Sequence, residues 1–351
     1  MSKKIALVHD WLTGLGGAER VLHELHEMFP DAPVYTLFAS KRFVAEFLPT
    51  AKVHTSFLQK LPLITRNYRF WAPLMPLAIE SFDLSDYDLV ISSSVLFSKG
   101  LIVRPKTKHI CYCYSPARPL WDRSSEYGKG LLSRHFWRIW DRQASDRVDE
   151  FVSISKTIQE RIKKYYGKDS RIIYPPLTLN VQAKEDAPEP NAYYLIVSRL
   201  FPNKNIEIAL DVFTKLNYPL VIIGDGPLRD KLESLAGKNI KFLGQRNDTT
   251  IATYYRHCRA LIMPQEEDFG LTPVEAMSFG KPVIALRKGG AVETIVEGVT
   301  GEFFDDPIPE ALADGLRRLN ENYDNYDEKI IMEQAKKFSR DKFRSEIMSL
   351  L

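Results

Sequence analysis

Short apolar segments alternate with longer amphipathic segments along most of this chain. The apolar segments are rich in Val and Ile, as strands of a parallel sheet are, and the amphipathic segments have the apolar spacing of helices. Repeated β-α-β units, and so an α/β fold, are predicted. In the first half the predicted strands are Ile5–His9, Val34–Phe38, Leu89–Ser93, His109–Tyr114 and Glu150–Ser155. The predicted helices there are Gly17–Met28, Ile64–Ser81, Leu131–Arg147 and Lys156–Tyr166.

A segment without periodicity, rich in proline and charge, separates this half from a second one. The second half has predicted strands at Tyr194–Ser198, Leu220–Gly224, Ile240–Leu243, Ala260–Met263 and Pro282–Ala285. Its predicted helices are Asn205–Leu216, Leu228–Ala236, Thr249–His257, Pro273–Phe279, Ala291–Val296, Glu310–Leu319 and Glu328–Leu350. We therefore predict two Rossmann-like, doubly wound domains, residues 1–177 and 192–351, joined by a linker over 178–191. The final helix could pack back on the N-terminal domain.

The net charge of +3 conceals a difference between the halves. Residues 1–177 carry 26 Lys and Arg against 18 Asp and Glu, whereas the rest of the chain carries 22 against 27. A basic first half suits an anionic partner such as a phosphate, a nucleic acid or a membrane surface. An ordinary solvated face explains the same charge and stays open.

Cysteine usage and hydropathy indicate where in the cell the protein is expected. The three cysteines, Cys111, Cys113 and Cys258, are too few and scattered for a disulfide framework or a four-cysteine zinc site. The N-terminus lacks the apolar core of a secretory signal, and no apolar stretch approaches the roughly 18 residues that span a bilayer. We expect a cytoplasmic protein, with the inner face of the membrane as its other expected location.

Glycines follow the first predicted strand in the segment Gly14-Leu-Gly-Gly-Ala-Glu19. Gly16 and Gly17 at a strand-to-helix turn let backbone N–H groups approach a phosphate, which makes them candidate donor-binding residues. A tight turn that needs glycine is the alternative. The spacing is not that of the dinucleotide fingerprint, and no acidic residue ends a second strand about 20 residues on, so NAD binding is disfavoured.

Two further segments in the second half come at strand ends, where open α/β sheets bind ligands. Arg199 and Lys204 follow one strand on a single connection, and two cations at this spacing suit a diphosphate. Gly224 ends the next strand, where glycine permits close approach of a ligand. A solvated loop and a plain turn are the respective alternatives.

A third segment runs from Pro264 through a glycine-containing loop into a helix. Glu267 and Glu275 could hold hydroxyl groups at the two ends of an extended donor, while the amides of Phe269, Gly270 and Leu271 face phosphate. Thr272-Pro-Val-Glu275 also has the pattern of a capping box with proline at the first helical position. Glu275 could thus serve only the helix terminus, and both interpretations remain open.

Taken together and in order, these motifs resemble glycosyltransferase family 4, in particular its mannosyltransferase-like subgroup. The resemblance rests on His9-Asp-Trp-Leu-Thr-Gly-Leu-Gly-Gly-Ala-Glu19, Ser198-Arg199…Lys204-Asn205, Gly224-Asp-Gly-Pro227, Glu267-x-Phe-Gly-Leu…Glu275-Ala-Met, Gly280-Lys-Pro-Val-Ile284 and Gly289-Gly290. It implies a GT-B fold with a central cleft between two Rossmann-like domains, no metal, no cofactor and retention of anomeric configuration. It also implies that Arg199 and Lys204 neutralise the diphosphate, that Glu267 binds sugar hydroxyls and that Glu275 binds the ribose.

The chain departs from this family at the end of the fourth strand, where many members carry a histidine. The matching segment here contains Tyr114, Arg118 and Asp122, which we take as candidate sugar- or acceptor-binding residues. Tyr114 cannot carry a proton near neutral pH as readily as histidine does. His109 lies on the strand itself and is expected to be a core residue.

Two stretches of the first half, residues 61–75 and 133–142, combine aromatic residues with arginines as interfacial helices do. Since family members often use lipid-linked acceptors, the stretches suggest peripheral membrane contact; a buried core role is the alternative.

The predicted function is transfer of a hexose, mannose in particular, from a nucleotide diphosphate sugar such as GDP-mannose to a glycan or lipid-linked glycan, as in polysaccharide biosynthesis. The alternatives are a sugar-nucleotide epimerase on the same scaffold and a non-catalytic anion- or nucleic-acid-binding protein; under the transferase prediction no nucleic-acid partner is expected.

Overall fold

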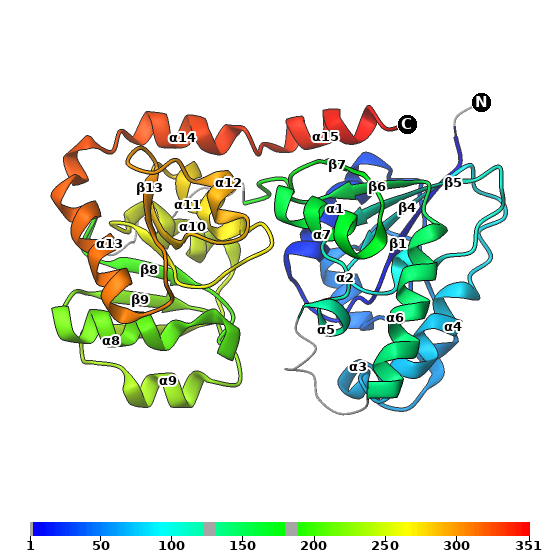
Figure 1. The fold of residues 1–351 in the computed structure, drawn as a ribbon, viewed down its shortest axis with the longest axis horizontal. Helices are drawn as coiled ribbons and strands as arrows, with labels where there is room; N and C mark the ends of the chain where they lie inside the picture. The colour runs from blue at the N-terminus through cyan, green and yellow to red at the C-terminus, as the bar shows by residue number, and fades with distance from the viewer. Residues whose placement is uncertain (1–2, 123–130, 180–188) are drawn as a thin grey trace. The chain divides into compact units, whose positions relative to one another are not determined.

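The computed structural model describes residues 3–122, 131–179 and 189–351, and it divides the chain into two compact units. Unit 1 comprises Met1–Tyr174 and Glu346–Leu351, and unit 2 comprises Pro175–Ser345. Most of the predicted linker over 178–191 lies outside the described residues. Figure 1 shows a ribbon of the two units.

Unit 1 is built on a parallel sheet that has seven strands among the described residues, in the order β3-β2-β1-β4-β5-β6-β7. The strands are β1 Ile5–His9, β2 Val34–Thr36, β3 Val53–Thr55, β4 Leu89–Ser94, β5 Lys108–Cys113, β6 Glu150–Ser153 and β7 Ser170–Ile172. The short edge strands β3 and β7 extend the five that the pattern predicts. The three buried cysteines are free thiols, and Cys111 and Cys113 lie on β5 as expected.

Of the four helices predicted in unit 1, three are confirmed and one is wrong, and the structure adds, within the ranges it describes, four short helices that were not predicted. They are α1 Gly17–Met28, α2 Lys41–Phe47, η1 Phe57–Lys60, α3 Ile64–Asn67, η2 Ala72–Leu74, α4 Met75–Glu80, η3 Ser98–Gly100, α5 Arg118–Trp121, α6 Leu131–Asp146 and α7 Lys156–Tyr166. The single helix predicted over Ile64–Ser81 is wrong, because the structure breaks it into α3, η2 and α4. Pro73 and Pro76 lie in the first turns of η2 and α4, where the missing N–H of proline is tolerated.

Unit 2 repeats the plan with a parallel sheet of six strands among the described residues, in the order β10-β9-β8-β11-β12-β13. The strands are β8 Tyr194–Val197, β9 Leu220–Ile223, β10 Ile240–Gly244, β11 Leu261–Met263, β12 Val283–Leu286 and β13 Gly301–Phe304. The helices are η4 Pro202–Lys204, α8 Ile206–Leu216, α9 Arg229–Leu235, α10 Asp248–His257, α11 Leu271–Ser278, α12 Ala291–Thr294, α13 Pro309–Glu321, η5 Tyr323–Asn325, α14 Glu328–Lys336 and α15 Arg340–Met348. β13 is the strand that the sequence pattern does not predict.

Both sheets are doubly wound, and the strand order reverses between β1 and β4 in unit 1 and between β8 and β11 in unit 2. The strands at each reversal are buried, as in a sheet covered on both faces. Ligands of open α/β sheets bind outside the carboxyl ends of the strands at such a reversal. The loops after these four strands are therefore where a site is expected.

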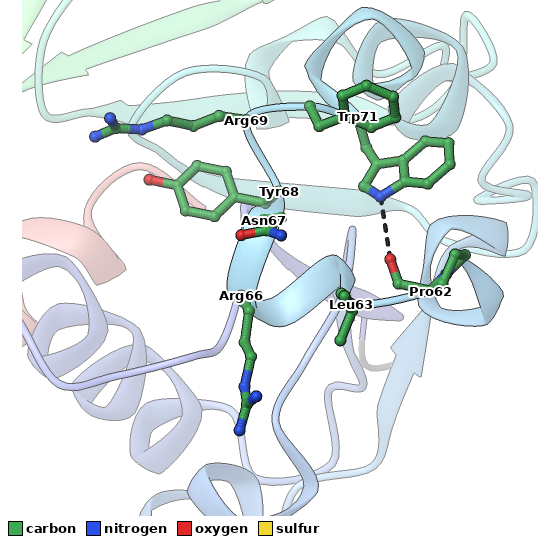
Figure 2. Close-up of a pocket in the computed structure, with 8 residues that line it drawn as sticks. Pro62, Leu63, Arg66, Asn67, Tyr68, Arg69 and Trp71 are labelled. Atoms are coloured by element: carbon green, nitrogen blue, oxygen red, sulfur yellow. Dashed lines mark hydrogen bonds between the residues drawn. The ribbon is translucent and has the colours of Figure 1, made fainter.

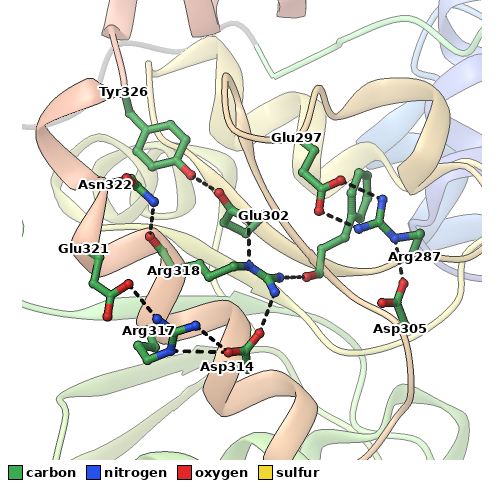
Figure 3. A network of polar contacts seen from close by, with 11 residues as sticks. Arg287, Glu297, Glu302, Asp305, Asp314, Arg317, Arg318, Glu321, Asn322 and Tyr326 are labelled. Atoms are coloured by element: carbon green, nitrogen blue, oxygen red, sulfur yellow. Dashed lines mark hydrogen bonds and ion pairs between the residues drawn. The ribbon is translucent and has the colours of Figure 1, made fainter.

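A network of ion pairs fixes the edge of the second sheet (Figure 3). Arg287, which follows β12, donates two hydrogen bonds to Glu297 and one to Asp305. Arg318 of α13 pairs with Glu302 of β13 and with Asp314 of its own helix. The network ties α13 to the last strand.

The last residues of the chain belong to unit 1. The predicted helix over Glu328–Leu350 is interrupted after Lys336, and α15 begins at Arg340. Lys108 of β5 donates a hydrogen bond from Nζ to the carbonyl of Leu350 at 2.8 Å. The C-terminus is thus held at the start of a strand of the first sheet.

Candidate functional site

The candidate site lies where the strand order of unit 2 reverses, between β8 and β11. The loop after β8 runs from Ser198 through η4 to Asn205, and the loop after β11 runs from Pro264 to Gly270. Asn205 adopts a left-handed conformation with φ 51° and donates from Nδ2 to the carbonyl of Pro264 at 3.1 Å. The side chain of Asn205 therefore holds the two loops together.

Lys204 and Glu267 form an ion pair that joins these loops. The Lys204 side chain is 8% exposed and that of Glu267 is 28% exposed, so the cation is buried while the carboxylate keeps access to solvent. The structure brings together two of the three predicted catalytic residues. It also places them against each other, although the family resemblance implies that they bind different parts of the donor.

Gln265 completes this cluster and was not predicted from the sequence. Its side chain is 3% exposed and donates from Nε2 to Glu267 Oε1 at 3.2 Å. Its other amide atom, Oε1, is buried and has no hydrogen-bond partner within the described residues. A polar residue two positions after a buried strand at the reversal point is the signal that could have identified it.

Arg199, the third predicted catalytic residue, lies on the same loop but points elsewhere. Its side chain is exposed, and its guanidinium lies over the ring of Phe201, with 5.6 Å between Cζ and the ring centroid. The described part of the chain contains no ion pair between Arg199 and Glu267. The Arg199 guanidinium is thus exposed to solvent and packs on an aromatic ring.

Gly224 is required by packing between loops. Its φ is 141°, and a Cβ added there would lie 1.9 Å from the carbonyl oxygen of Ser198. Ser198 in turn donates its backbone N–H to the carbonyl of Ile223 at 3.0 Å. The turn after β9 therefore supports the loop after β8, and this contact accounts for the glycine without a ligand.

Gly289 and Gly290 support the other loop in the same way. A Cβ on Gly289 would lie 2.1 Å from the carbonyl oxygen of Glu267, and one on Gly290 would lie 2.2 Å from that of Phe269. Gly290 also donates its N–H to the carbonyl of Glu267 at 2.9 Å. The backbone that carries Glu267 is therefore fixed by close contact with the turn after β12.

The predicted phosphate-facing segment Phe269-Gly270-Leu271 forms the start of α11. Gly270 is the N-cap residue with φ 84°, and Leu271 is the first residue of the helix. The Phe269 side chain is buried and packs edge-on against Phe338, with ring centroids 5.5 Å apart. The Phe269 side chain therefore belongs to the core of unit 2.

Glu275 lies inside α11 and is held by a tyrosine. Because the N-cap is Gly270, Thr272 is not at the helix terminus, and the capping-box interpretation of Glu275 is wrong. Glu275 is buried and accepts a hydrogen bond from Tyr255 Oη at 2.8 Å. The structure thus fixes one carboxylate oxygen through a residue of α10.

Polar side chains also gather at the reversal point of unit 1, at the ends of β1, β4 and β5. His9 is buried, and its Nδ1 lies 3.0 Å from Ser93 Oγ while its Nε2 lies 3.5 Å from Glu19 Oε1. Gly16 caps α1 and Gly17 begins it. His9 was not selected as a site residue, although it ends the first strand.

Tyr114, the candidate sugar-binding residue, belongs to this cluster. It donates from Oη to the carbonyl of Ala18 at 3.0 Å and lies 2.9 Å from Ser93 Oγ. Burial raises the pKa of Tyr114 well above its usual value. The hydroxyl is therefore a neutral group that holds the first turn of α1 to the strand ends.

Asp10 fixes the neighbouring loop of unit 1. Its fully buried carboxylate accepts hydrogen bonds from the backbone N–H groups of Val95, Leu96, Phe97 and Ser98 at 2.6 to 2.8 Å. This carboxylate orders the connection after β4.

The other two acceptor-side candidates lie on α5 and at its end. Arg118 is the first residue of α5. Asp122 pairs with Arg161 of α7 at 3.2 Å and accepts a hydrogen bond from Tyr165. These contacts give Asp122 a role in packing α5 against α7. His109 is buried and contacts Ser92 Oγ at 2.8 Å, and burial lowers its pKa to about 4, as a core residue requires.

The described residues contain no group of three or more His, Cys, Asp and Glu side chains that could hold a metal ion. Nor does any helix among them have the length and apolarity needed to cross a membrane.

Two family models match the chain one after the other. Residues 15–181 match the model described as Glycosyltransferase Family 4, and residues 179–338 match Glycosyl transferases group 1. An uncharacterized glycosyltransferase of Methanocaldococcus jannaschii is 28% identical over 208 residues, which are 58% of this chain and 58% of that protein.

Two mannosyltransferases are also similar to the chain. The alpha-1,3/1,6-mannosyltransferase of Candida glabrata is 26% identical over 84% of this chain and 78% of its own length. A GDP-mannose-dependent alpha-mannosyltransferase of Mycolicibacterium smegmatis is 29% identical over 52% of this chain and 51% of its own length.

Solved structures share the fold. HepE of Anabaena in complex with UDP-glucose superposes with a TM-score of 0.72 at 20% identity and covers 99% of this chain and 100% of that one. Sucrose-phosphate synthase of Thermosynechococcus elongatus gives a TM-score of 0.78 at 17% identity, with 99% and 98% covered.

Proposed function

The chain belongs to the glycosyltransferases of the GT-B fold, with a family 4 domain over residues 15–181 and a group 1 domain over 179–338, and we propose that it is a retaining hexosyltransferase. The donor is a nucleotide diphosphate sugar, and the proposed sugar is mannose, carried by GDP. The similarity to two mannosyltransferases supports this choice.

One observation carries the proposal: Lys204, Gln265 and Glu267 meet at the carboxyl ends of β8 and β11. A buried lysine attracts a diphosphate strongly because little water screens its charge. The same lysine pairs with Glu267. An arriving diphosphate competes for Lys204, and this exchange frees the partly exposed Glu267 carboxylate to accept hydrogen bonds from sugar hydroxyls.

The remaining donor contacts follow from the same loops. Arg199 swings from Phe201 to the diphosphate, and the backbone N–H groups at the start of α11 face its phosphate oxygens. Glu275, held by Tyr255, binds the ribose hydroxyls.

The proposed reaction needs no metal and no protein base. The acceptor hydroxyl oxygen forms a bond to the anomeric carbon on the face from which the bond to the diphosphate oxygen breaks. The acceptor proton passes to a diphosphate oxygen, so the products are the glycoside and the protonated nucleoside diphosphate. The protein supplies orientation of the sugar and stabilisation of the charge that develops on the diphosphate.

The acceptor is proposed to be a glycan or lipid-linked glycan of polysaccharide biosynthesis, and the protein is proposed to work in the cytoplasm at the inner face of a membrane. The basic first half of the chain supports contact with an anionic acceptor or surface.

A thermal-shift screen of the purified protein against GDP-mannose, UDP-glucose and the free nucleotides tests the donor. A ligand that binds only the folded form raises the melting temperature by mass action. We expect GDP-mannose to give the largest rise. A larger rise with UDP-glucose would replace the proposed donor, and no rise with any nucleotide sugar would overturn the function.

A further inference from the structure

Unit 1 exposes large apolar side chains over a short stretch around α3. Leu63 is 61% exposed and Phe70 is 76% exposed, and Leu77 of α4 follows at 60%. The neighbouring Tyr68 and Trp71 pack against the hydrophobic core of the unit. The aromatic stretch predicted over 61–75 is therefore divided between core and surface, and the exposed Phe70 lies edge-on to Trp71, with ring centroids 5.0 Å apart.

Leu63, Arg66, Arg69 and Phe70 line one hollow of about 710 Å³. Figure 2 shows this hollow, with Leu63, Arg66 and Arg69 labelled. Trp71 closes its rim by donating from Nε1 to the carbonyl of Pro62 at 3.2 Å. We refer to these four residues as the α3 surface. Neither arginine forms an ion pair with a carboxylate of the described chain.

The backbone of Leu63 is in an unusual conformation for an exposed leucine. Its φ is 52° and its ψ is 24°, a left-handed conformation that costs a non-glycine residue free energy. Such strain usually persists only where the surrounding structure or a function requires it. Here Leu63 is the N-cap residue of α3, and its side chain is exposed to solvent.

The sequence on both sides of α3 carries charge of one sign. The sequence from Phe47 to Ile79 contains no Asp or Glu, whereas it contains Lys52, Lys60, Arg66 and Arg69. Arginines beside exposed leucine and phenylalanine match the chemistry of a bilayer surface, because the headgroups accept the cations and the boundary with the acyl chains takes the apolar groups. A second copy of the chain meeting it across a two-fold axis would bring arginines against arginines.

We infer that the α3 surface binds the surface of an anionic lipid bilayer, with Leu63 and Phe70 inserted and Arg66 and Arg69 on the headgroups. The inference deepens the proposed function, because it rests on the proposed lipid-linked acceptor and names the surface that brings unit 1 to it. Binding to lipid needs neither donor nor turnover, so it can be measured separately from transfer.

The test is sedimentation of the full chain with phosphatidylcholine vesicles, with and without phosphatidylglycerol. We expect binding that requires the anionic lipid and weakens with salt. Arg66→Gln and Arg69→Gln should each weaken it about fivefold. The double variant Leu63→Ala/Phe70→Ala should weaken it about tenfold or more.

Control variants in unit 2 remove positive charges and an exposed apolar side chain away from the α3 surface. Lys329→Gln/Lys336→Gln on α14 removes two exposed charges, and Leu235→Ala removes a leucine that is 54% exposed. These should bind vesicles as wild type does. Melting temperature and stabilisation by donor should be unchanged in every variant, which separates a folding defect or a wrong donor from loss of lipid contact.

The inference would be overturned if wild type did not bind anionic vesicles, or if the α3-surface variants bound them as wild type does. It would also be overturned by a dimer, detected by sedimentation velocity, that the Leu63→Ala/Phe70→Ala variant abolishes while vesicles are not bound, because the surface would then serve a second copy of the chain.

Discussion

Replacing Lys204 by methionine separates the stabilising role of its ion pair from its proposed role in transfer. The variant keeps the length of the side chain and removes its charge. Glu267 is left without its cation, but it is 28% exposed and keeps the hydrogen bond from Gln265. We therefore expect a loss of about 1–2 kcal/mol in the free energy of unfolding, less than the 3–5 kcal/mol typical of breaking a fully buried pair.

The expected effect on transfer is much larger. Removing one group that stabilises developing charge in a water-poor site typically lowers turnover about 10²- to 10³-fold, or roughly 2.7–4 kcal/mol. Steady-state release of nucleoside diphosphate measures this loss, and urea unfolding measures the stability.

Lys281→Met is the matched control. Lys281 is also a buried lysine of unit 2 and pairs with Glu328 at 2.9 Å, away from the loops after β8 and β11. It should lose comparable stability and keep its turnover. Near-wild-type transfer by Lys204→Met, or an equal loss of transfer in both variants, would refute the reasoning.

Three further predictions concern stability. Gly224→Ala, which places Cβ 1.9 Å from the Ser198 carbonyl, should cost about 3 kcal/mol, whereas Gly14→Ala, with nothing within 4 Å, should be nearly neutral; equal melting temperatures would contradict the packing argument. Asp10→Ala removes the acceptor of four backbone N–H groups, two of them buried and two partly buried, and should cost about 3 kcal/mol or more by urea unfolding. The His109 pKa of about 4 lies below its unfolded value, so the contribution of His109 to stability is complete above about pH 6.5 and is lost as the pH falls toward 4. Between pH 7 and 5, wild type should therefore lose about 2 kcal/mol more stability than His109→Asn. Parallel pH profiles of the two proteins would contradict this.

Local pattern was sufficient for the elements that carry the loops of the site. β8 and β11, which carry these loops, lie within one residue of their predicted bounds, because each is an unbroken apolar run. In unit 1, β1 and α1 have the predicted bounds. β13 was missed because it has only four residues and because Gly301 and Glu302 leave an apolar run of two. The helix over 64–81 was overpredicted because apolar spacing outweighed its prolines, which restrict helix continuation.

The site could be predicted as a set of loops but not as a set of contacts. Lys204 and Glu267 were found because each follows a buried strand. Their pairing, and that of Tyr255 with Glu275, joins residues on different elements, and spacing along the chain carries no information about such contacts. Gln265 was missed for the same reason.

The most direct test of the account is the ratio of affinities for the sugar donor and for its free nucleoside diphosphate, measured by calorimetry on wild type and Glu267→Gln. If Glu267 binds the sugar, the variant should bind the nucleoside diphosphate at least as tightly as wild type does, because Lys204 no longer pairs with a carboxylate. It should lose the additional affinity for the donor, while Glu328→Gln keeps both. An unchanged ratio in Glu267→Gln would contradict the assignment of this site to the transferred sugar.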